Sequence, residues 1–408
     1  MSPFDLNIRH LRGLLQVCEA GSISAAAPRL NISQPALTQG IVKLESLLGH
    51  ILFERRPDGM IPTEVGSLFF DRVRAFFEHL NAGMKALAIN GLQVDRRLNM
   101  AQFKAFLAVV QAGSFVAASS AIDLSQPAVH RAVRELEDAL KKQLVERRGR
   151  GVHVNFLGRR FARSCRLAVA ELQSAFIELG IDAHRRTIAI GTTPLARAYL
   201  VPEAMATVMA ETRSISFHVS EGNWGDLVEL LRDGLIDMIV GELPSHESPD
   251  LKKIVLCQEQ SVVVAGKNHP LARKGAMVGI ESLSKYPWIV PPENSPLRDV
   301  WSRLFHERER PATPIECGSI MIIGRLLTSS EMLTIATPDQ VALQIRTGLL
   351  ARIPLPFETG SHTIGFTIRD RWRPTVAQQH FLDALTHVAK QVSIRGSDTA
   401  GIAKQWNS

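Results

Sequence analysis

The feature that most constrains this chain is an internal repeat with a period of 92 residues. The segment Leu6–Arg56 aligns with Leu98–Arg148 without a gap, and 20 of the 51 aligned positions are identical. The register continues through two pairs of glycines, Gly59/Gly151 and Gly66/Gly158. Such a repeat indicates the tandem duplication of one folding unit. The N-terminal half must therefore fold as two similar domains.

Each copy predicts three helices followed by a basic hairpin. In the first copy, apolar residues recur at helical spacing from Ile8 to Cys18, and Gly21 ends that helix. A short Ala-rich helix follows over residues 24–30, and Pro28 within it should distort it. A third helix begins at Ser33-Gln34-Pro35-Ala36, because Ser can cap a helix and Pro is tolerated in its first turn.

The third helix of each copy has a polar outer face at its N-terminus. A helix, a short turn and a second helix with such a face is the geometry that enters the major groove of DNA, while arginines of the hairpin can hold phosphates. The alternative is a three-helix bundle whose polar face is only solvated. The residues predicted to contact DNA are Ser33, Gln34, Pro35, Thr38, Gln39, Lys43, Arg55 and Arg56 in copy one, and Ser125, Gln126, Pro127, His130, Arg131, Arg134, Arg147, Arg148 and Arg150 in copy two.

The positive charge is confined to the repeated half. Residues 1–185 carry 24 Lys+Arg and 17 Asp+Glu, a net of +7, whereas residues 186–408 carry 23 of each. A basic excess in one region suggests a polyanionic partner, although a modest excess can also serve only solubility. Residues 1–96 have a net charge of +1 and residues 97–185 of +6. Copy two is therefore expected to bind phosphates more strongly.

These motifs resemble the winged helix-turn-helix of the LysR-type transcriptional regulators. The similarity rests on Ala-Gly-Ser, Ser-Gln-Pro-Ala, Leu-Glu and Glu-Arg-Arg, which occur in this order in both copies. Family members normally carry one such domain, so the second copy is a departure. The resemblance implies a DNA-binding regulator without enzymatic activity or a cofactor. It also implies a small-molecule effector, assembly into a homo-oligomer, and RNA polymerase as a candidate partner.

An amphipathic helix is expected after each hairpin. The apolar stripes that begin at Phe69 and at Phe161 have identical spacings. In the family the corresponding helix pairs with that of a second subunit, and here we expect the two helices of one chain to pair with each other; the alternative is that each packs only on its own domain. The linker between the copies has eight residues and spans at most about 28 Å. The predicted segments are two winged domains (5–65 and 98–157), two connecting helices (66–89 and 158–181), the linker (90–97), an effector domain (186–392) and a tail (393–408).

From Arg186 onward, short β-rich runs alternate with helices, which predicts an α/β domain with a largely parallel sheet. The chain as a whole is thus α/β, with two mainly helical winged domains in front. Residues 186–390 resemble the effector domain of the same family, two α/β lobes around a cleft as in type 2 periplasmic binding proteins. Runs such as Tyr286-Pro287-Trp288 are most similar to the sugar-responsive subgroup named for the galactose-binding-protein regulator.

Hydroxyl groups at expected helix N-termini suggest where an effector binds. Thr192 and Thr193 follow the first strand of this half and are expected to open a helix over residues 195–209. Ser295 opens a helix in the facing lobe, and Gly318 with Ser319 opens the next. Such groups suit a polar or anionic ligand, either a sugar or a small carboxylate. The alternative is that these side chains only cap helices.

Other chemistry is sparse. There is no HxxxH or HxH metal spacing, no phosphate loop and no nucleophile elbow. Cys257 and Cys317 are either a redox pair or, as favoured here, structural thiols. The sequence has no run of 18 apolar residues, which argues against a membrane span. It also shows no export signal and has four cysteines without a CxxC motif, which points to the cytoplasm. The remaining alternative is a solute-binding or enzymatic α/β protein with a helical assembly module.

Overall fold

The computed structural model describes residues 1–56, 59–89, 97–148, 151–182, 186–212, 214–273, 276–306 and 309–405. The chain divides into two compact units, Met1–Arg185 and Arg186–Ser408. Nearly all of the predicted linker 90–97 lies outside the described residues. The boundary between the units agrees with the change of pattern at Arg186.

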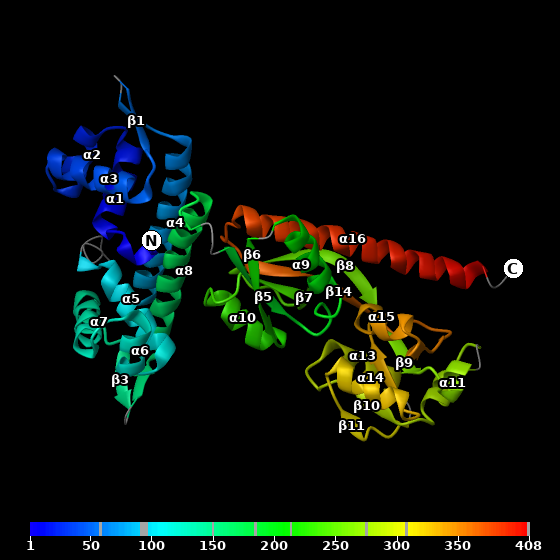
Figure 1. The fold of residues 1–408 in the computed structure, drawn as a ribbon. Coiled ribbons are helices and arrows are strands. Elements are labelled where there is room, and N and C mark those ends of the chain that lie inside the picture. Colours follow the sequence, from blue (N-terminus) through cyan, green and yellow to red (C-terminus); the bar gives the residue numbers. More distant parts are fainter. Residues whose placement is uncertain are drawn as a thin grey trace. The chain divides into compact units, whose positions relative to one another are not determined.

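The first unit contains the two copies of the repeat, whose α-helices and strands follow in the same order with the same lengths (Figure 1). The second helix has eight residues in both copies, so Pro28 does not shorten it. Copy one consists of a 3-10 turn η1 (Pro3–Asp5), α1 (Ile8–Ala20), α2 (Ile23–Leu30), α3 (Gln34–Leu48), β1 (Phe53–Arg56), β2 (Gly59–Pro62) and α4 (Glu64–Ala86). Copy two consists of α5 (Met100–Ala112), α6 (Phe115–Ile122), α7 (Gln126–Leu140), β3 (Val145–Arg148), β4 (Gly151–Val154) and α8 (Phe156–Glu178).

The connecting helices α4 and α8 begin two residues before the predicted positions because each has an N-cap just upstream. The side chain of Thr63 accepts a hydrogen bond from the Gly66 amide, and that of Asn155 accepts one from the Gly158 amide. Two different wing sequences thus provide the same cap.

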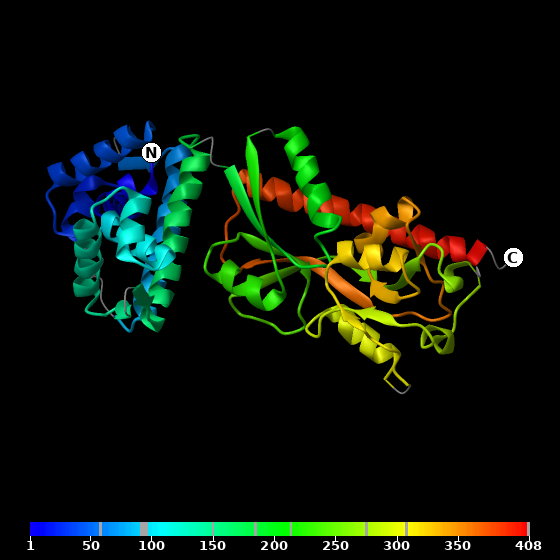
Figure 2. The ribbon, with the colours of Figure 1, turned by 60° about the horizontal axis from the view of Figure 1, so that its bottom comes forward.

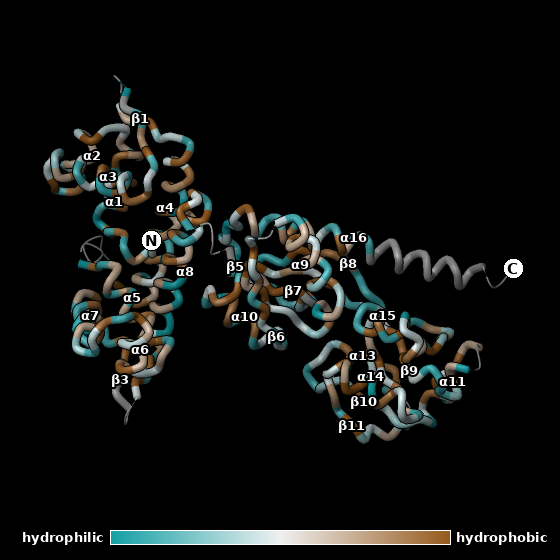
Figure 3. Tube along the Cα trace, viewed as in Figure 1, coloured by the Kyte–Doolittle hydropathy of each residue, from teal (hydrophilic) through white to brown (hydrophobic). Residues whose placement is uncertain are grey.

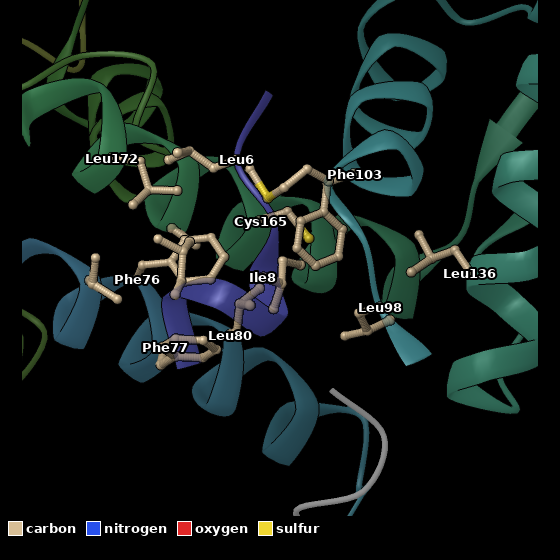
Figure 4. Close-up of a cluster of buried hydrophobic side chains, with 14 of the residues drawn as sticks. Leu6, Ile8, Phe76, Phe77, Leu80, Leu98, Phe103, Leu136, Cys165 and Leu172 are labelled. Carbon is tan, nitrogen blue, oxygen red and sulfur yellow. The ribbon is translucent and has the colours of Figure 1, made fainter. Parts of the chain in front are cut away.

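Helices α4 and α8 pack against each other, which confirms the predicted pairing of the two stripes within one chain. The fully buried residues of the pair belong to a single hydrophobic cluster that contains residues of both copies. Figure 4 shows Phe76 and Leu80 of α4 near Cys165 and Leu172 of α8. The two wings, β1–β2 and β3–β4, lie at opposite ends of this helix pair (Figure 1).

The second unit consists of two α/β lobes (Figure 2). Lobe one has the strand order β6-β5-β7-β14-β8 and lobe two the order β11-β10-β12-β9-β13. Hydrophobic residues gather on inner strands of both sheets, as at β7 and β10 (Figure 3). Lobe one contains β5 (Arg186–Thr192), α9 (Leu200–Glu211), β6 (Ile215–Glu221), α10 (Trp224–Arg232), β7 (Met238–Glu242), β8 (Leu251–Gln260), β14 (Ser361–Arg369) and α16 (Val376–Gln405). Lobe two contains β9 (Val262–Gly266), α11 (Pro270–Arg273), α12 (Ile280–Leu283), β10 (Trp288–Val290), α13 (Pro296–Leu304), β11 (Ile315–Glu316), α14 (Ile320–Thr328), β12 (Leu333–Ala336), α15 (Pro338–Arg346) and β13 (Leu350–Arg352).

Three features of this unit differ from the sequence-based prediction. The ten-residue strand β8 was not predicted, since its lysines hide the alternation; it lies at the edge of its sheet, where charges are tolerated. Strand β14 runs antiparallel to both β7 and β8. Helix α16 continues to Gln405, through most of the predicted tail.

Candidate functional site

The third helix of each copy, α3 and α7, is the candidate reading helix. Ser33 and Ser125 cap them as predicted: the Ser33 hydroxyl accepts a hydrogen bond from the Ala36 amide at 3.3 Å, and the Ser125 hydroxyl accepts one from the Ala128 amide at 3.4 Å. Most of the predicted reading residues are exposed, namely Gln34, Pro35, Gln39 and Lys43 on α3 and Gln126, Pro127, Arg131 and Arg134 on α7.

Two predicted reading residues are only half-exposed. The hydroxyl of Thr38 donates to the backbone oxygen of Gln34 at 2.9 Å. The ring of His130 packs on Phe115, with the ring centroids 5.0 Å apart. The predicted DNA contacts of Thr38 and His130 therefore compete with contacts inside their own domains.

A glutamate near the end of each reading helix fixes the wing that follows. The Oε1 atom of Glu45 accepts the amide of Leu52 at 2.8 Å and that of Phe53 at 3.4 Å. In copy two, Glu137 accepts the corresponding amides of Leu144 at 2.7 Å and Val145 at 3.0 Å. Sequence reasoning did not assign this function, although the repeated Leu-Glu pair was the available signal.

The wing also contacts the turn that precedes the second helix. The amide of Met60 donates to the oxygen of Gly21 at 2.8 Å, and in copy two Val152 donates to Gly113 at 3.0 Å. A Cβ atom on Gly59 would lie 2.6 Å from that same Gly21 oxygen. This close approach explains the glycine at position 59.

The wing arginines are only partly described. In β1, Arg56 forms an ion pair with Glu54 at 3.0 Å, and both side chains are about half exposed. The side chains of Arg55, Arg147 and Arg148, and the whole of Arg150, lie outside the described part of the chain. Their phosphate contacts stay predictions.

The second unit has a cleft between its lobes with a volume of about 440 Å³. Lobe one contributes Leu195, Asn223 and Glu242, and lobe two contributes the segment from Pro291 to Leu297, the segment from Glu316 to Gly318, and Gln340. Ser295 and Gly318, both predicted effector residues, line this cleft. Ser319 lines an adjoining groove with Pro194, Arg197 and Glu221.

Thr192 and Thr193 lie beneath the cleft rather than on its lining. Thr192 is the last residue of β5, and the expected helix after it begins only at Leu200, so neither threonine stands at a helix N-terminus. Both are buried. The hydroxyl of Thr193 donates to the carboxylate of Glu242, which does line the cleft. Thr193 therefore positions a lining group.

Ser295 and Ser319 occupy the N-cap positions of α13 and α14, yet neither side chain makes a capping hydrogen bond. The alternative that these serines serve only as caps is therefore not supported by their geometry. The nearby Arg298 donates from Nη1 to the oxygen of Pro291 at 2.9 Å and to Glu316 at 3.2 Å.

The lining of the cleft is acidic. It includes Glu242, Glu293 and Glu316, and no lysine or arginine belongs to its described lining. Burial raises the pKa of Glu242 above the ordinary value, although the Thr193 hydroxyl opposes the shift. Glu242 can therefore be neutral more readily than an exposed glutamate.

Several hydrogen bonds join the two lobes around the cleft. Gln340 donates from Nε2 to the oxygen of Pro194 at 3.1 Å, and Arg197 donates from Nη2 to the oxygen of Gly318 at 3.1 Å. The carboxylate of Glu259 in lobe one accepts the amide of Asp339 at 3.0 Å. Burial, followed by the charge of Asp339, raises the pKa of Glu259 to about 7.

No sign of redox or metal chemistry emerges from the described residues. The four cysteines are free, and burial, together with the charges of Glu259 and Asp339, raises the pKa of Cys257 to about 11, which disfavours a reactive thiolate. The described residues form no His/Cys/Asp/Glu group that could hold a metal ion. None of the described helices is long and apolar enough to cross a bilayer.

Two winged helix-turn-helix domains followed by a two-lobed domain with a ligand-sized cleft define a ligand-responsive DNA-binding protein. Comparison with known families agrees. The profile of the bacterial regulatory helix-turn-helix proteins of the lysR family matches twice, at residues 8–67 and 100–159, and the LysR substrate binding domain matches residues 182–390. The chain belongs to the LysR family of transcriptional regulators.

Curated relatives and solved structures fit this assignment. The transcriptional regulator GalR of Pseudomonas putida is 26% identical over 368 residues, which cover 89% of this chain and 92% of GalR. GbpR of Azospirillum brasilense is 27% identical over 67% of this chain and 82% of its own. The structure of LysG from Corynebacterium glutamicum with bound effector Arg shares the fold, with a TM-score of 0.53 and 17% identity over 72% of this chain and 99% of LysG. The relatives are regulators, which favours regulation over the enzymatic alternative.

Proposed function

We propose that α3 and α7 both read double-stranded DNA and that a ligand in the cleft between the lobes controls this binding. The observation that carries the proposal is that one DNA-reading device is built twice with the same internal contacts. In both copies a serine caps the reading helix, a glutamate fixes the wing, and polar side chains remain exposed.

Copy two contributes more to phosphate binding. Arg131 and Arg134 are exposed on α7, whereas the matching residues of α3 are the uncharged Gln39 and Val42. Cations that neutralise phosphates release counterions, so their removal lowers both the affinity and its salt dependence. The predicted contacts of the wing arginines Arg147 and Arg148 add to this difference.

Fluorescence anisotropy with a labelled duplex of mixed sequence, repeated at several salt concentrations, tests this. The double variant Arg147→Ala/Arg148→Ala should bind more weakly and lower the slope of log K against log[salt] by about one to two units. The matched variant Arg55→Ala/Arg56→Ala should do less damage. A larger loss from the copy-one pair would contradict the assignment, and no binding by the parent chain would overturn the proposed function.

The chemistry of the cleft favours a neutral polyhydroxylated ligand, such as a sugar, over a small carboxylate. An anion would meet Glu293 on a described lining that holds no lysine or arginine, while the nearby Arg298 is already paired with Glu316. Asn223, Ser295 and Gln340 supply neutral donors and acceptors. Gln340 also links the lobes, so a ligand that binds it favours one lobe arrangement by its differential affinity.

A thermal-shift screen with galactose, glucose and arabinose against pyruvate and succinate tests the ligand class. A ligand at a hundred times its Kd stabilises the native state by about 2.7 kcal/mol. We expect a sugar to raise the Tm, and the Ser295→Ala variant to reduce that shift. Stabilisation by the carboxylates alone would contradict the proposal. Assembly into a homo-oligomer and contact with RNA polymerase, which the family resemblance implies, belong to the same proposal.

A further inference from the structure

A cluster of charged residues is buried between α4 and α8. Arg72 of α4 donates from Nη1 to Glu171 at 2.8 Å and from Nε to Glu178 at 3.1 Å, and its Nη2 also contacts Glu178. The three side chains are only 6%, 8% and 11% exposed. His79 of α4 lies 3.7 Å from the other oxygen of Glu171. One copy supplies Arg72 and His79, and the other supplies both carboxylates.

The repeat register shows that this cluster occurs on one side of the helix pair only. The residues 92 positions apart are Arg72 and Ser164, His79 and Glu171, and Ala86 and Glu178. His79 and Glu171 are equivalent positions that meet at the pseudo-twofold axis of the pair. The contact related to Arg72–Glu178 by this pseudo-twofold axis would join Ser164 to Ala86, and neither of these residues carries a charge.

Pairs of like copies would therefore bury unbalanced charge. Two copies of α4 would each place Arg72 opposite His79 and Ala86, with no carboxylate at these positions. Two copies of α8 would bury Glu171 and Glu178 twice, opposite Ser164. Breaking a buried ion pair by removing one partner is strongly destabilising because the remaining charge is left uncompensated. Only the unlike pair places carboxylates opposite Arg72.

Steric and polar contacts outside the charged cluster are also specific to the unlike pair. A Cβ atom on Gly83 would lie 2.6 Å from the Cβ atom of Ser164, and the residue equivalent to Gly83 in copy two is Ala175. The ring of His50 contacts the backbone oxygen of Leu179 at 3.1 Å, and the equivalent of His50 is Lys142. Each contact uses a residue that the other copy lacks.

The two reading helices that this pair brings together are not alike. They share Gln34 and Gln126 at the N-terminus. They differ at several exposed positions, among them Gln39, Val42 and Lys43 on α3 against Arg131, Arg134 and Glu135 on α7. Glutamine suits the adenine edge in the major groove, whereas arginine suits guanine.

We propose that this protein recognises a DNA site composed of two unlike half-sites, because the buried charges require every reading pair to contain one copy of each kind. The inference rests on the proposed DNA-binding function. It holds whether the two copies of a pair come from one chain or from two chains.

In vitro selection with the full chain tests the inference without a known operator. A duplex library with about 30 random base pairs is long enough for two half-sites one helical turn apart. The expected result is an enriched site whose halves differ, with guanine contacts prominent in one half. Enrichment of an inverted repeat would overturn the inference while leaving DNA binding intact. Enrichment of no sequence would overturn the proposed function as well.

Exchange variants assign the half-sites to the copies. The variant Gln39→Arg/Val42→Arg/Lys43→Glu gives α3 three of the exposed residues of α7, and selection should then shift the α3 half-site toward the α7 half-site. The matched variant Arg131→Gln/Arg134→Val/Glu135→Lys should shift the α7 half-site toward the α3 half-site. All six positions are exposed, so the fold is retained. A selected site unchanged in both variants would refute the inference.

Discussion

Replacing Arg72 with Met tests whether the buried charges hold the two copies together. The variant leaves Glu171 and Glu178 almost fully buried without their strongest partner. Breaking a buried pair in this way costs about 3–5 kcal/mol. With a urea m-value of about 2 kcal/mol/M, the unfolding midpoint of the first unit should fall by roughly 1.5–2.5 M.

The distribution of tryptophan provides the assay. All five tryptophans lie at or beyond residue 224, so their fluorescence reports on the second unit alone. Far-UV circular dichroism also follows the helices of the first unit. In Arg72→Met, part of the dichroism transition should move to lower urea, while the tryptophan transition stays in place.

The control is Arg74→Met on the same helix. Arg74 pairs with Asp71 at 2.9 Å, but these side chains are 47% and 56% exposed. An exposed pair contributes about 0–1 kcal/mol, so this variant should be nearly neutral. Equal effects of Arg72→Met and Arg74→Met would refute the reasoning.

The effect of Arg72→Met should also depend on pH. Burial pushes the pKa of Glu171 upward, but hydrogen bonds from His79 and Arg72 and the charge of Arg72 outweigh it, so the pKa lies below its ordinary value. Such a carboxylate contributes stability above its unfolded pKa and loses it as the pH falls through the folded pKa. The difference between parent and variant should therefore be large at neutral pH and narrow in acid.

Three further predictions follow from single sites. Lys141 ends α7 in the left-handed region with φ 52°, where copy one has Gly49, so Lys141→Gly should stabilise the first unit by about 0.5–1 kcal/mol in urea unfolding. Because burial raises the pKa of Glu259 to about 7, ionisation of this carboxyl opposes folding. The free energy of unfolding detected by tryptophan fluorescence should therefore fall as the pH rises from about 4.5 to 7 in the parent, and should fall less in Glu259→Gln. Identical pH profiles of the two proteins would exclude Glu259 as the cause. Thr193→Val removes the donor to Glu242 and should abolish the ligand-induced Tm shift while leaving the affinity of the ligand-free chain for DNA unchanged; a normal dose response would contradict the role of Thr193.

The parts of the fold that depend on local patterns could be predicted from the sequence. The helices of each copy follow from periodicity and from caps such as Ser33 and Gly21, and the duplication supplied each pattern twice. The expected start of the helix after Thr193 was wrong because tertiary contacts hold the threonine against Val240 and Glu242, and α9 begins only at Leu200.

The charged cluster could not be predicted because it depends on the register between two helices. Glu171 and Glu178 lie seven residues apart on one face of α8, which was a visible signal of an interrupted apolar face. Only the packing of α4 against α8 shows that Arg72 lies opposite both of them. For the same reason, the sequence could not show that the fully buried Thr193 acts through a residue of the cleft lining.

Cys165 makes the separation of the two copies measurable in the native protein. It is fully buried in the core that α4 and α8 share, and burial raises its pKa, whereas Cys18, Cys257 and Cys317 are partly exposed. A thiol reagent can reach Cys165 only when α4 and α8 separate, so Cys165 should be labelled more slowly than the other cysteines. The ratio of its labelling rate in the native protein to its rate in the unfolded chain gives the free energy of local opening. Kinetic labelling can therefore report how often the two reading helices come apart, without any foreign probe.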